Sequence, residues 1–404
     1  MRTGARRSPN MPLNRRETLG LLAGSVTLMA TRPVRATQES TPVIETPLPP
    51  FANLLELETL ASKVIPKPAF DYIARGAGDE QTLRENRDAF SRVFIDQRVL
   101  TGKTVQALDT LILGSLLKSP LVVATMAAHG LVHTTAESGS ARGAAAYGTL
   151  LEVSAVSTQN LEQIAAASNG DKWFQCYLTR DVGFNRELLQ RAQAAGYTAI
   201  VLTADVTVGG NREQDRRNAL CLPIPGNFLD RTGRPRAINR VFENRLGPDS
   251  LDFVRQHSGG LPLVLKGVTT AADARLALRH GVDAIQVSNH GGRQLDGSPA
   301  AFDSLLRVAA EVQGQVPIIF DSGIRRGLDV FKALAAGADA VAIGRPVLYG
   351  LSLGGWQGVH AVLEHLESEL RTVMQLAGAA TLADIRATPL LNPDGSPLQQ
   401  GIRS

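Results

Sequence analysis

The stretch Val287-Ser288-Asn289-His290-Gly291-Gly292-Arg293-Gln294-Leu295 joins an apolar, β-branched run to a polar, glycine-rich turn. This pattern is typical of a buried strand followed by a loop. Within the turn, His290 can take up or give a proton near neutral pH. Arg293 carries a planar fork that matches a carboxylate. We therefore expect chemistry on a small carboxylic acid here, against the simpler alternative of a buried structural histidine beside a surface arginine.

Eight short apolar runs recur along the chain, and they do not alternate with polar residues. Such runs are expected of parallel strands that are buried on both faces. Most of the segments between them have a helical pattern that ends at a glycine, as at Gly196, Gly281 and Gly337. Eight strand–helix units predict an α/β fold, a (β/α)8 TIM barrel, with a doubly wound open sheet as the alternative. The runs are Leu121–Ala124, Thr149–Val153, Trp173–Tyr177, Ala199–Thr203, Pro262–Lys266, Ala284–Val287, Pro317–Phe320 and Ala340–Ile343.

Polar or ionisable side chains follow nearly every one of these runs. In a TIM barrel the C-terminal ends of the strands meet at one face, where active sites lie. We therefore expect these strand-end residues to converge on one site. They are Thr125, Met126, Ala127, Ser154, Gln175, Tyr177, Thr203, Asp205, Lys266, Ser288, His290, Arg293, Asp321, Gly323, Gly344 and Arg345.

The last two strand ends predict a phosphate site. Glycines in Asp321–Gly327 and Gly344–Pro346 let the backbone approach phosphate oxygens, while Arg325 and Arg345 add positive charge. No Gly-x-Gly-x-x-Gly follows a strand, so a dinucleotide site is not indicated. Because Lys266 could stabilise a negatively charged reduced ring, the pattern suits flavin mononucleotide (FMN). A sugar-phosphate enzyme is the alternative on spacing alone.

The ends of the chain have patterns of their own. Arg15-Arg16 precedes the apolar run Leu19–Ala30, and Val34-Arg35-Ala36 offers small residues to a signal peptidase. We expect residues 1–36 to be a twin-arginine-type signal, cleaved near Ala36, that sends the protein to the periplasm or outside the cell. An ordinary secretion signal and a retained anchor are the alternatives. Residues 37–53 read as a Pro- and Thr-rich linker, 54–391 as the barrel domain and 392–404 as a C-terminal tail.

Within the domain, two short helices are expected at residues 54–63 and 68–75, before the barrel begins. A third helix is expected at 358–377, after the last strand. The connection between the fourth and fifth strands is long, from about Val206 to Gly260, and connections of this length are usually lids or binding loops.

Composition narrows the functional classes. With 404 residues, 44% of them hydrophobic, the chain can bury a large core. The net charge is +4, and several of the basic residues fall within the expected signal. No basic patch is interleaved with aromatic residues, so a nucleic-acid partner is not expected. The two cysteines, Cys176 and Cys221, are not at metal-ligand spacing, so neither a metal site nor a disulfide framework is expected.

Taken together, these motifs resemble those of the FMN-dependent α-hydroxy acid oxidising enzymes. The resemblance begins with Ser288–Gln294, which is similar to the active-site signature of that family, and it extends from about residue 54 to 391. Four further segments look most like the L-lactate oxidase branch: Ala128–Leu131, Trp173–Gln175, Gly210–Arg212 and Gly350–Gly358.

The resemblance implies a role for each matching residue. It makes His290 the base and Asp205 the partner that orients it and stabilises its protonated form. It implies that Arg293 and Arg212 hold the substrate carboxylate, and that Tyr72 and Tyr177 bond the carboxylate and the reacting hydroxyl. Lys266 would lie by the N1/O2 edge of the flavin. Further contacts to FMN are implied for Thr125, Met126, Ala127, Ser154, Gln175, Thr203, Ser288, Asp321, Gly323, Arg325, Gly344 and Arg345.

The implied reaction is the oxidation of an L-2-hydroxy acid to the 2-keto acid. His290 removes the hydroxyl proton as a hydride passes to the flavin, or it takes the α-hydrogen in the carbanion version. The electrons then go to oxygen, giving hydrogen peroxide, or alternatively to a quinone or a cytochrome. Family analogy implies a homotetramer. An isomerase on a similar barrel and a flavin-binding protein without activity are the competing classes.

Two positions depart from the family pattern. Val156 stands where the family often has Trp or Tyr, and Leu222 stands where L-lactate oxidases have a tyrosine. Both changes remove bulky or polar aromatic groups. We therefore expect a roomier, more apolar pocket, suited to a longer-chain or aromatic 2-hydroxy acid.

Overall fold

The computed structural model describes residues 48–398 of the chain. The signal predicted for residues 1–36 lies outside the described residues, as do most of the predicted linker and the last six residues of the predicted tail. Among residues 48–398, no helix combines the length and the apolarity that crossing a membrane requires.

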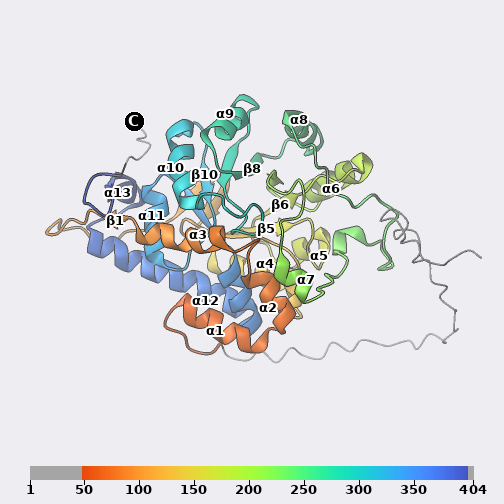
Figure 1. Cartoon of the computed structure of the whole chain (residues 1–404), viewed down its shortest axis with the longest axis horizontal. Helices are drawn as coiled ribbons and strands as arrows, with labels where there is room; N and C mark the ends of the chain where they lie inside the picture. The colour runs from red at the N-terminus through yellow and green to blue at the C-terminus, as the bar shows by residue number, and fades with distance from the viewer. Residues whose placement is uncertain (1–47, 399–404) are drawn as a thin grey trace, which may run out of the picture. The chain divides into compact units, whose positions relative to one another are not determined.

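Eight parallel strands close into a barrel in the order β10-β11-β4-β5-β6-β7-β8-β9 (Figure 1). Closure occurs where β11 pairs with β4, with Val341 opposite Leu121, so the TIM barrel is confirmed and the open sheet is excluded. Every predicted strand is present, with ends that differ from the prediction by at most two residues. The strands are β4 (Leu121–Met126), β5 (Leu151–Ser154), β6 (Lys172–Cys176), β7 (Ala199–Thr203), β8 (Leu263–Val268), β9 (Ala284–Val287), β10 (Ile318–Phe320) and β11 (Ala340–Ile343).

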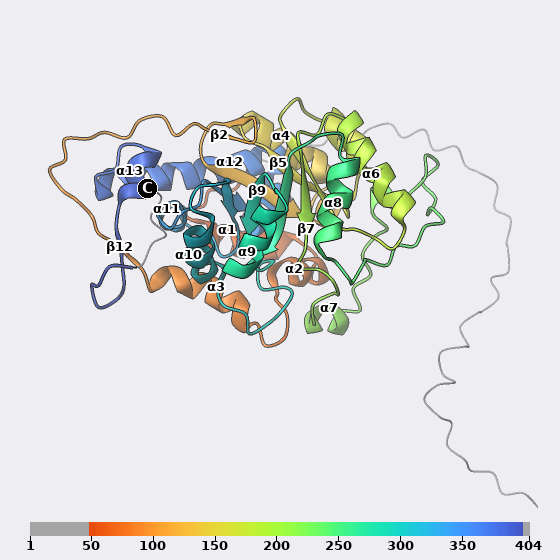
Figure 2. The same cartoon turned by 90° about the horizontal axis from the view of Figure 1, so that it is seen from above.

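A helix follows each strand and packs against the outside of the barrel (Figure 2). The predicted stops at Gly196, Gly281 and Gly337 have positive φ angles of 81°, 65° and 109°, a backbone conformation that glycine adopts without strain. The helices are α4 (Ala136–Tyr147), α5 (Leu161–Ala166), α6 (Val182–Ala194), α8 (Pro248–His257), α9 (Ala271–Arg279), α10 (Ala301–Val312), α11 (Gly327–Ala335) and α12 (Arg345–Ala377).

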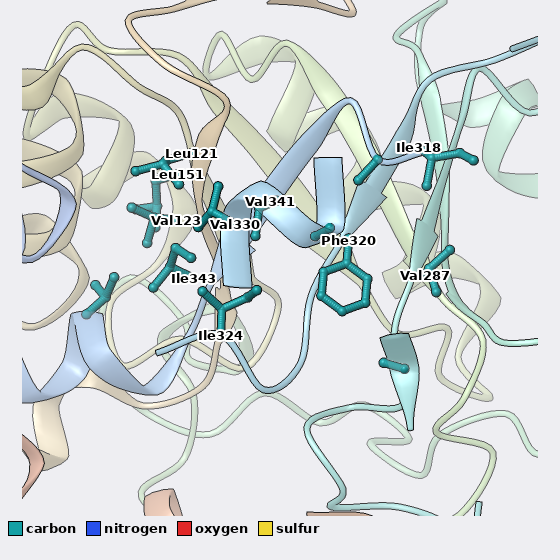
Figure 3. Packing of buried hydrophobic residues seen from close by; sticks show 14 of the residues in the cluster. Leu121, Val123, Leu151, Val287, Ile318, Phe320, Ile324, Val330, Val341 and Ile343 are labelled. Atoms are coloured by element: carbon teal, nitrogen blue, oxygen red, sulfur yellow. The ribbon is translucent and has the colours of Figure 1, made fainter. Parts of the chain in front are cut away.

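The strands bury two separate apolar layers. In β4, Leu121 and Val123 belong to the layer between strands and helices, whereas Val122 and Ala124 belong to a second cluster inside the barrel. Figure 3 shows members of the outer layer from several strands, together with Val330 of α11. This alternation follows from the period of two along a strand.

The barrel interior changes character from one end to the other. At the N-terminal end, a short hairpin, β2 (Thr110–Ile112) and β3 (Ser115–Leu117), adds Ile112 and Leu117 to the inner apolar cluster. This hairpin was not predicted. Toward the C-terminal ends of the strands, inward positions become polar while remaining buried, as at Gln175, Lys266 and Gln286. The polar end of the interior is where the site forms.

Helices outside the barrel follow the prediction only in part. The first two, α1 (Leu54–Val64) and α2 (Lys67–Ala74), are confirmed, but α3 (Gln81–Ser91) was missed. α1 packs against α12, so segments from opposite ends of the described chain lie together (Figure 1). The chain closes with α13 (Leu382–Ala387) and β12 (Leu390–Leu391), which pairs with β1 (Phe94–Ile95).

The predicted last helix and the predicted long connection, between Thr203 and Leu263, are both present, and each segment contains more helix than expected. α12 consists of two helices joined by a kink, where Gly354 and Gly355 leave helical φ/ψ values. The helix predicted at 358–377 corresponds to the second part, and the first part, from Arg345 to the kink, was not predicted. The predicted lid over residues 206–260 contains α7 (Glu213–Arg217), the short 3-10 turn η2 (Gly226–Phe228) and, at its end, the barrel helix α8. Pro248 occupies the first position of α8, where proline favours a helix start, so the irregular part of the connection is shorter than expected.

Candidate active site

A cavity of about 500 Å³ opens at the C-terminal ends of the barrel strands. Its lining contains most of the residues that the sequence predicted for the site: Tyr72, Thr125, Met126, Ala127, Ser154, Tyr177, Arg212, Lys266, His290, Arg293, Asp321, Gly323, Arg325, Gly344 and Arg345. Four other predicted residues are near the lining without belonging to it: Gln175, Thr203, Asp205 and Ser288. The convergence of strand ends expected from the sequence is therefore present.

The four residues behind the lining support the residues that line it. The Gln175 amide nitrogen donates to the Thr203 hydroxyl at 2.9 Å, and its oxygen accepts from Ser154 at 3.1 Å. The Ser288 hydroxyl accepts from the Lys266 ammonium group at 2.8 Å and donates to Asp321 at 2.7 Å. These bonds hold the side chains of Gln175, Thr203 and Ser288 in place, and their contacts to the flavin stay predictions.

His290 has the geometry of a general base. The turn after β9 places it at a φ of 59°, and its Nδ1 lies 3.0 Å from Asp205 Oδ1. Burial lowers the pKa of His290 even though Asp205 raises it, so the imidazole is neutral near pH 7. Asp205 remains ionised, because His290 and Lys266 outweigh the effect of burial and hold its pKa below the usual value. An ionised Asp205 accepts a hydrogen bond from Nδ1–H of His290, so the neutral ring keeps Nε2 free of a proton and able to accept one.

Two arginines and two tyrosines lie on the same cavity as His290. The guanidinium carbons of Arg293 and Arg212 lie 4.8 Å and 5.7 Å from the centre of the Tyr72 ring. Arg293 is held in place by bonds to the carbonyl oxygens of Tyr72 and Arg75. Burial raises the pKa of the Tyr177 hydroxyl above its usual range, so this group stays protonated and can donate. A small carboxylate with an adjacent hydroxyl could therefore meet a cation, a donor and a base at once.

The cavity lining also has more positive charge than its carboxylates balance. Arg345 donates to the carbonyl oxygens of Ile73 at 2.7 Å and Gly291 at 3.0 Å. Within residues 48–398, neither Arg293 nor Arg345 forms an ion pair with a carboxylate. Burial, with the nearby Arg293 and Arg325, lowers the pKa of Arg345 to about 9. Anionic ligands stabilise partly buried cations that have no carboxylate partner, so the arrangement suits one or two anions.

The FMN-dependent dehydrogenase family matches residues 61–392 of the chain. The chain belongs to this family. An L-lactate oxidase from Streptococcus iniae is 45% identical over 343 residues, which cover 83% of this chain and 85% of that protein. Glycolate oxidase 3 from Oryza sativa subsp. japonica is 40% identical over 348 residues, covering 83% and 95%.

Solved structures agree with the family assignment. A lactate oxidase from Pediococcus acidilactici superposes with a TM-score of 0.82 and 44% identity, covering 86% of this chain and 96% of that one. A mandelate oxidase with (S)-2-phenylpropionate superposes with a TM-score of 0.79 and 38% identity, covering 85% and 99%. The chain is thus similar to flavin oxidases of small 2-hydroxy acids in both sequence and fold.

FMN is the cofactor of this family, and the cavity fits it. The unbalanced charge of Arg345, with Arg325 and the glycines Gly323 and Gly344 in the lining, would hold a phosphate group. Lys266 would stand near the electron-accepting ring. Burial lowers the pKa of Lys266, but Asp321, Asp205 and Glu152 together raise it above its usual value, so it remains a cation. Such a cation would favour negative charge on the ring.

Several residues of the cavity were not predicted from the sequence. Val156 and Leu222 line it as expected, but so do Ile224, Arg240 and Phe242 of the lid. The Phe242 ring stacks on Tyr177, with ring centres 4.8 Å apart. Their position in a long connection was the only available signal. Among residues 48–398, no three His, Cys, Asp or Glu side chains are grouped so that they could hold a metal ion.

Proposed function

We propose that this chain oxidises an L-2-hydroxy acid to the corresponding 2-keto acid with FMN and passes the electrons to oxygen. The observation that carries the proposal is the His290–Asp205 pair, joined at 3.0 Å, on a cavity that also presents the Arg293 guanidinium group. A base beside a carboxylate-binding cation is what removal of a proton from a hydroxy acid requires.

In the proposed reaction, each protein group has one task. Arg293 and Arg212 bind the substrate carboxylate and so fix the orientation of its α-carbon. Nε2 of His290 accepts the hydroxyl proton, and Asp205 stabilises the imidazolium that forms. Tyr177 donates a hydrogen bond to the substrate and stays protonated throughout. Bound FMN supplies the acceptor for the two electrons that leave the α-carbon.

Oxygen is proposed as the final electron acceptor because the relatives at 40–45% identity are named as oxidases of lactate and glycolate. Oxygen takes two electrons and two protons to give hydrogen peroxide, which balances the two hydrogens lost by the hydroxy acid. A quinone or a cytochrome would accept the same electrons without forming peroxide.

The proposed substrate is a longer-chain or aromatic 2-hydroxy acid. The cavity wall formed by Val156, Leu222, Ile224 and Phe242 is apolar, and a side chain of this kind would gain free energy by leaving water there. The similarity to a mandelate oxidase of known structure supports an aromatic candidate. Lactate and glycolate would leave this wall without contact.

The test starts from protein that begins at residue 37. It is mixed in air with lactate, glycolate, 2-hydroxyoctanoate and mandelate, and oxygen uptake, peroxide and keto acid are measured together. We expect oxygen to be consumed, and peroxide and keto acid to be formed, in equal molar amounts. The highest kcat/KM is expected for 2-hydroxyoctanoate or mandelate. Keto acid formed only with an added quinone or cytochrome would contradict the proposed acceptor. A preference for glycolate or lactate would contradict the proposed substrate class.

We further propose that residues 1–36 are a twin-arginine signal, followed by a linker at 37–53, the enzyme domain at 54–391 and a tail at 392–404. Export of a folded protein suits one that must bind its cofactor before it leaves the cytoplasm. Replacing Arg15 and Arg16 by lysine should keep the full-length protein in the cytoplasm, as seen by cell fractionation. Periplasmic protein from that variant would contradict the signal. Light scattering tests the homotetramer that family analogy implies.

A further inference from the structure

A buried carboxyl group with no part in the proposed reaction lies beneath the cavity. Glu152 is on β5 and is only 1% exposed. Its Oε2 accepts from the backbone N–H of Thr125 at 3.0 Å and from the Gln286 amide at 3.3 Å. Among residues 48–398, its Oε1 has no hydrogen-bond partner. A carboxyl group in this position is costly to bury, so its partners indicate what it does.

The bond to Thr125 compensates for an irregularity in the barrel. Between two paired positions, Val123–Leu151 and Met126–Val153, β4 advances three residues while β5 advances two. A bulge of this kind takes one backbone group out of the strand ladder. Glu152 accepts from the N–H of Thr125 within the bulge. The segment that follows, residues 125–127, lines the cavity that fits FMN.

Glu152 also belongs to a buried network of charges. The Gln286 amide that bonds Glu152 also donates to Asp321 Oδ2 at 2.9 Å, and Asp321 lies 3.6 Å from the Lys266 ammonium group. The carboxyl groups of Glu152 and Asp321 thus both interact with the Lys266 ammonium group. Burial raises the pKa of Glu152 to about 7, and Asp321 raises it while Lys266 lowers it.

The other neighbours of the Glu152 carboxyl group are not titratable. The backbone N–H of Thr125 on β4 and the Gln286 amide on β9 both lower the pKa of Glu152 by bonding to the ionised form. On β6, the position opposite Glu152 in register is Trp173. A change in the charge of this group therefore acts mainly on Asp321 and Lys266.

We propose that Glu152 is a positioning residue that anchors the β4 bulge beside FMN and, when ionised, opposes negative charge on the reduced cofactor near Lys266. The proposal rests on the FMN site described above. Its physical basis is that like charges in a poorly solvated interior repel each other more strongly than they do in water.

Two substitutions separate the two parts of this proposal. Glu152→Gln keeps an oxygen that can accept from Thr125 and Gln286, but it cannot ionise. Glu152→Leu keeps a similar size and removes the acceptor. Glu367→Gln is the matched control, because Glu367 is also a buried carboxylate, bonded to Tyr147 at 2.8 Å, but it lies outside the cavity lining.

The first experiment measures the midpoint potential of bound FMN against dyes, without oxygen, from about pH 5.5 to about pH 9. We expect equal potentials for wild type and Glu152→Gln at the acidic end, where Glu152 is protonated. As Glu152 ionises, the wild-type potential should fall below that of Glu152→Gln, while Glu367→Gln should follow the wild type throughout. Identical pH profiles for wild type and Glu152→Gln would overturn the electrostatic part of the proposal.

The second experiment measures the dissociation constant of FMN by fluorescence titration of the apoproteins. Glu152→Gln should bind FMN like the wild type. Glu152→Leu should bind it about tenfold or more weakly, because the N–H of Thr125 loses its acceptor and the bulge before residues 125–127 is no longer anchored. Wild-type affinity in Glu152→Leu would overturn the positioning role. If that variant does not fold, the potentials of Glu152→Gln still decide the electrostatic part. Wild-type protein that binds no FMN would overturn this proposal and the proposed function together, whereas loss of the pH effect alone leaves the proposed function standing.

Discussion

The two walls of the cavity differ in chemistry and in how they are held. The barrel wall presents His290, Lys266 and Arg293, each fixed by a bond to a neighbouring group of the fold. The lid wall presents mainly apolar residues, such as Leu222 and Ile224, with Arg212 and Arg240, from a connection with little regular structure. We infer that the strand ends, together with Arg212 at the start of the lid, determine the reaction, and that the apolar lid residues, together with Val156, determine which side chain the substrate carries.

The largest effect should follow from removing the base on the barrel wall. In His290→Asn, the ring nitrogen that takes the substrate proton is absent, so kcat/KM should fall by about 10²–10⁴-fold. FMN binding should be unchanged, as measured by absorbance after gel filtration. A fall of less than about tenfold would mean that the proton goes to another group.

Removing the carboxylate clamp should have the next largest effect. Arg293→Met loses a charge-assisted hydrogen bond, which contributes about 1.5–3 kcal/mol, so kcat/KM should fall by about 10–150-fold. Arg275→Met is the matched control, because Arg275 pairs with Glu311 on the surface. Steady-state kinetics that show similar values for both variants would contradict the clamp.

The pH profile tests the partnership of His290 and Asp205. Burial holds the pKa of His290 below its usual value, so wild-type kcat/KM should stay level through neutral pH and fall only in acid, where the base becomes protonated. Asp205 raises the pKa of His290, so Asp205→Asn should move this fall to still lower pH. The same variant should lower kcat by about tenfold or more, because the imidazolium loses an ionised partner. An acid limb that moves to higher pH would contradict the pairing.

The smallest effect is expected at the apolar part of the cavity, which Val156, in the turn after β5, lines together with the lid residues Leu222 and Ile224. It should change which substrate is preferred rather than the rate. Val156→Trp narrows the cavity, so the ratio of kcat/KM for mandelate to that for lactate should fall by about tenfold, within the 1–3 kcal/mol typical of steric discrimination in pockets. Competition assays with both acids in one vessel measure this ratio directly. An unchanged ratio would mean that the apolar wall does not contact the substrate.

Much of the barrel could be predicted from sequence because buried parallel strands are continuous apolar runs and helices end at glycines. The polar residues after those runs had to meet once the barrel closed, which placed His290, Lys266 and Arg345 correctly. By contrast, α3 is a polar helix whose N-cap, Glu80, makes no side-chain capping bond, so its sequence shows little helical signal. The strands of the β2–β3 hairpin have only three residues each, too few for a clear pattern.

The lid residues could not be predicted because their position depends on the path of a long connection. Nothing near Ile224 or Phe242 in the sequence indicates that either faces a cavity. Glu152, in contrast, has a signal in the sequence. Glu152 interrupts the apolar run Leu150-Leu151-Glu152-Val153, and a carboxylate inside a strand that is buried on both faces requires a reason.

The central claim is that the cavity holds FMN and that His290 makes a 2-hydroxy acid its reductant. The most direct test is the visible spectrum of the purified, flavin-loaded protein during titration without oxygen, using lactate, 2-hydroxyoctanoate and mandelate. We predict that the oxidised flavin bands of the wild type disappear with at least one acid, and that those of His290→Asn persist over the same period. The central claim would be contradicted by a wild-type flavin that remains oxidised with every acid, or by flavin bands that fade equally fast in the wild type and in His290→Asn.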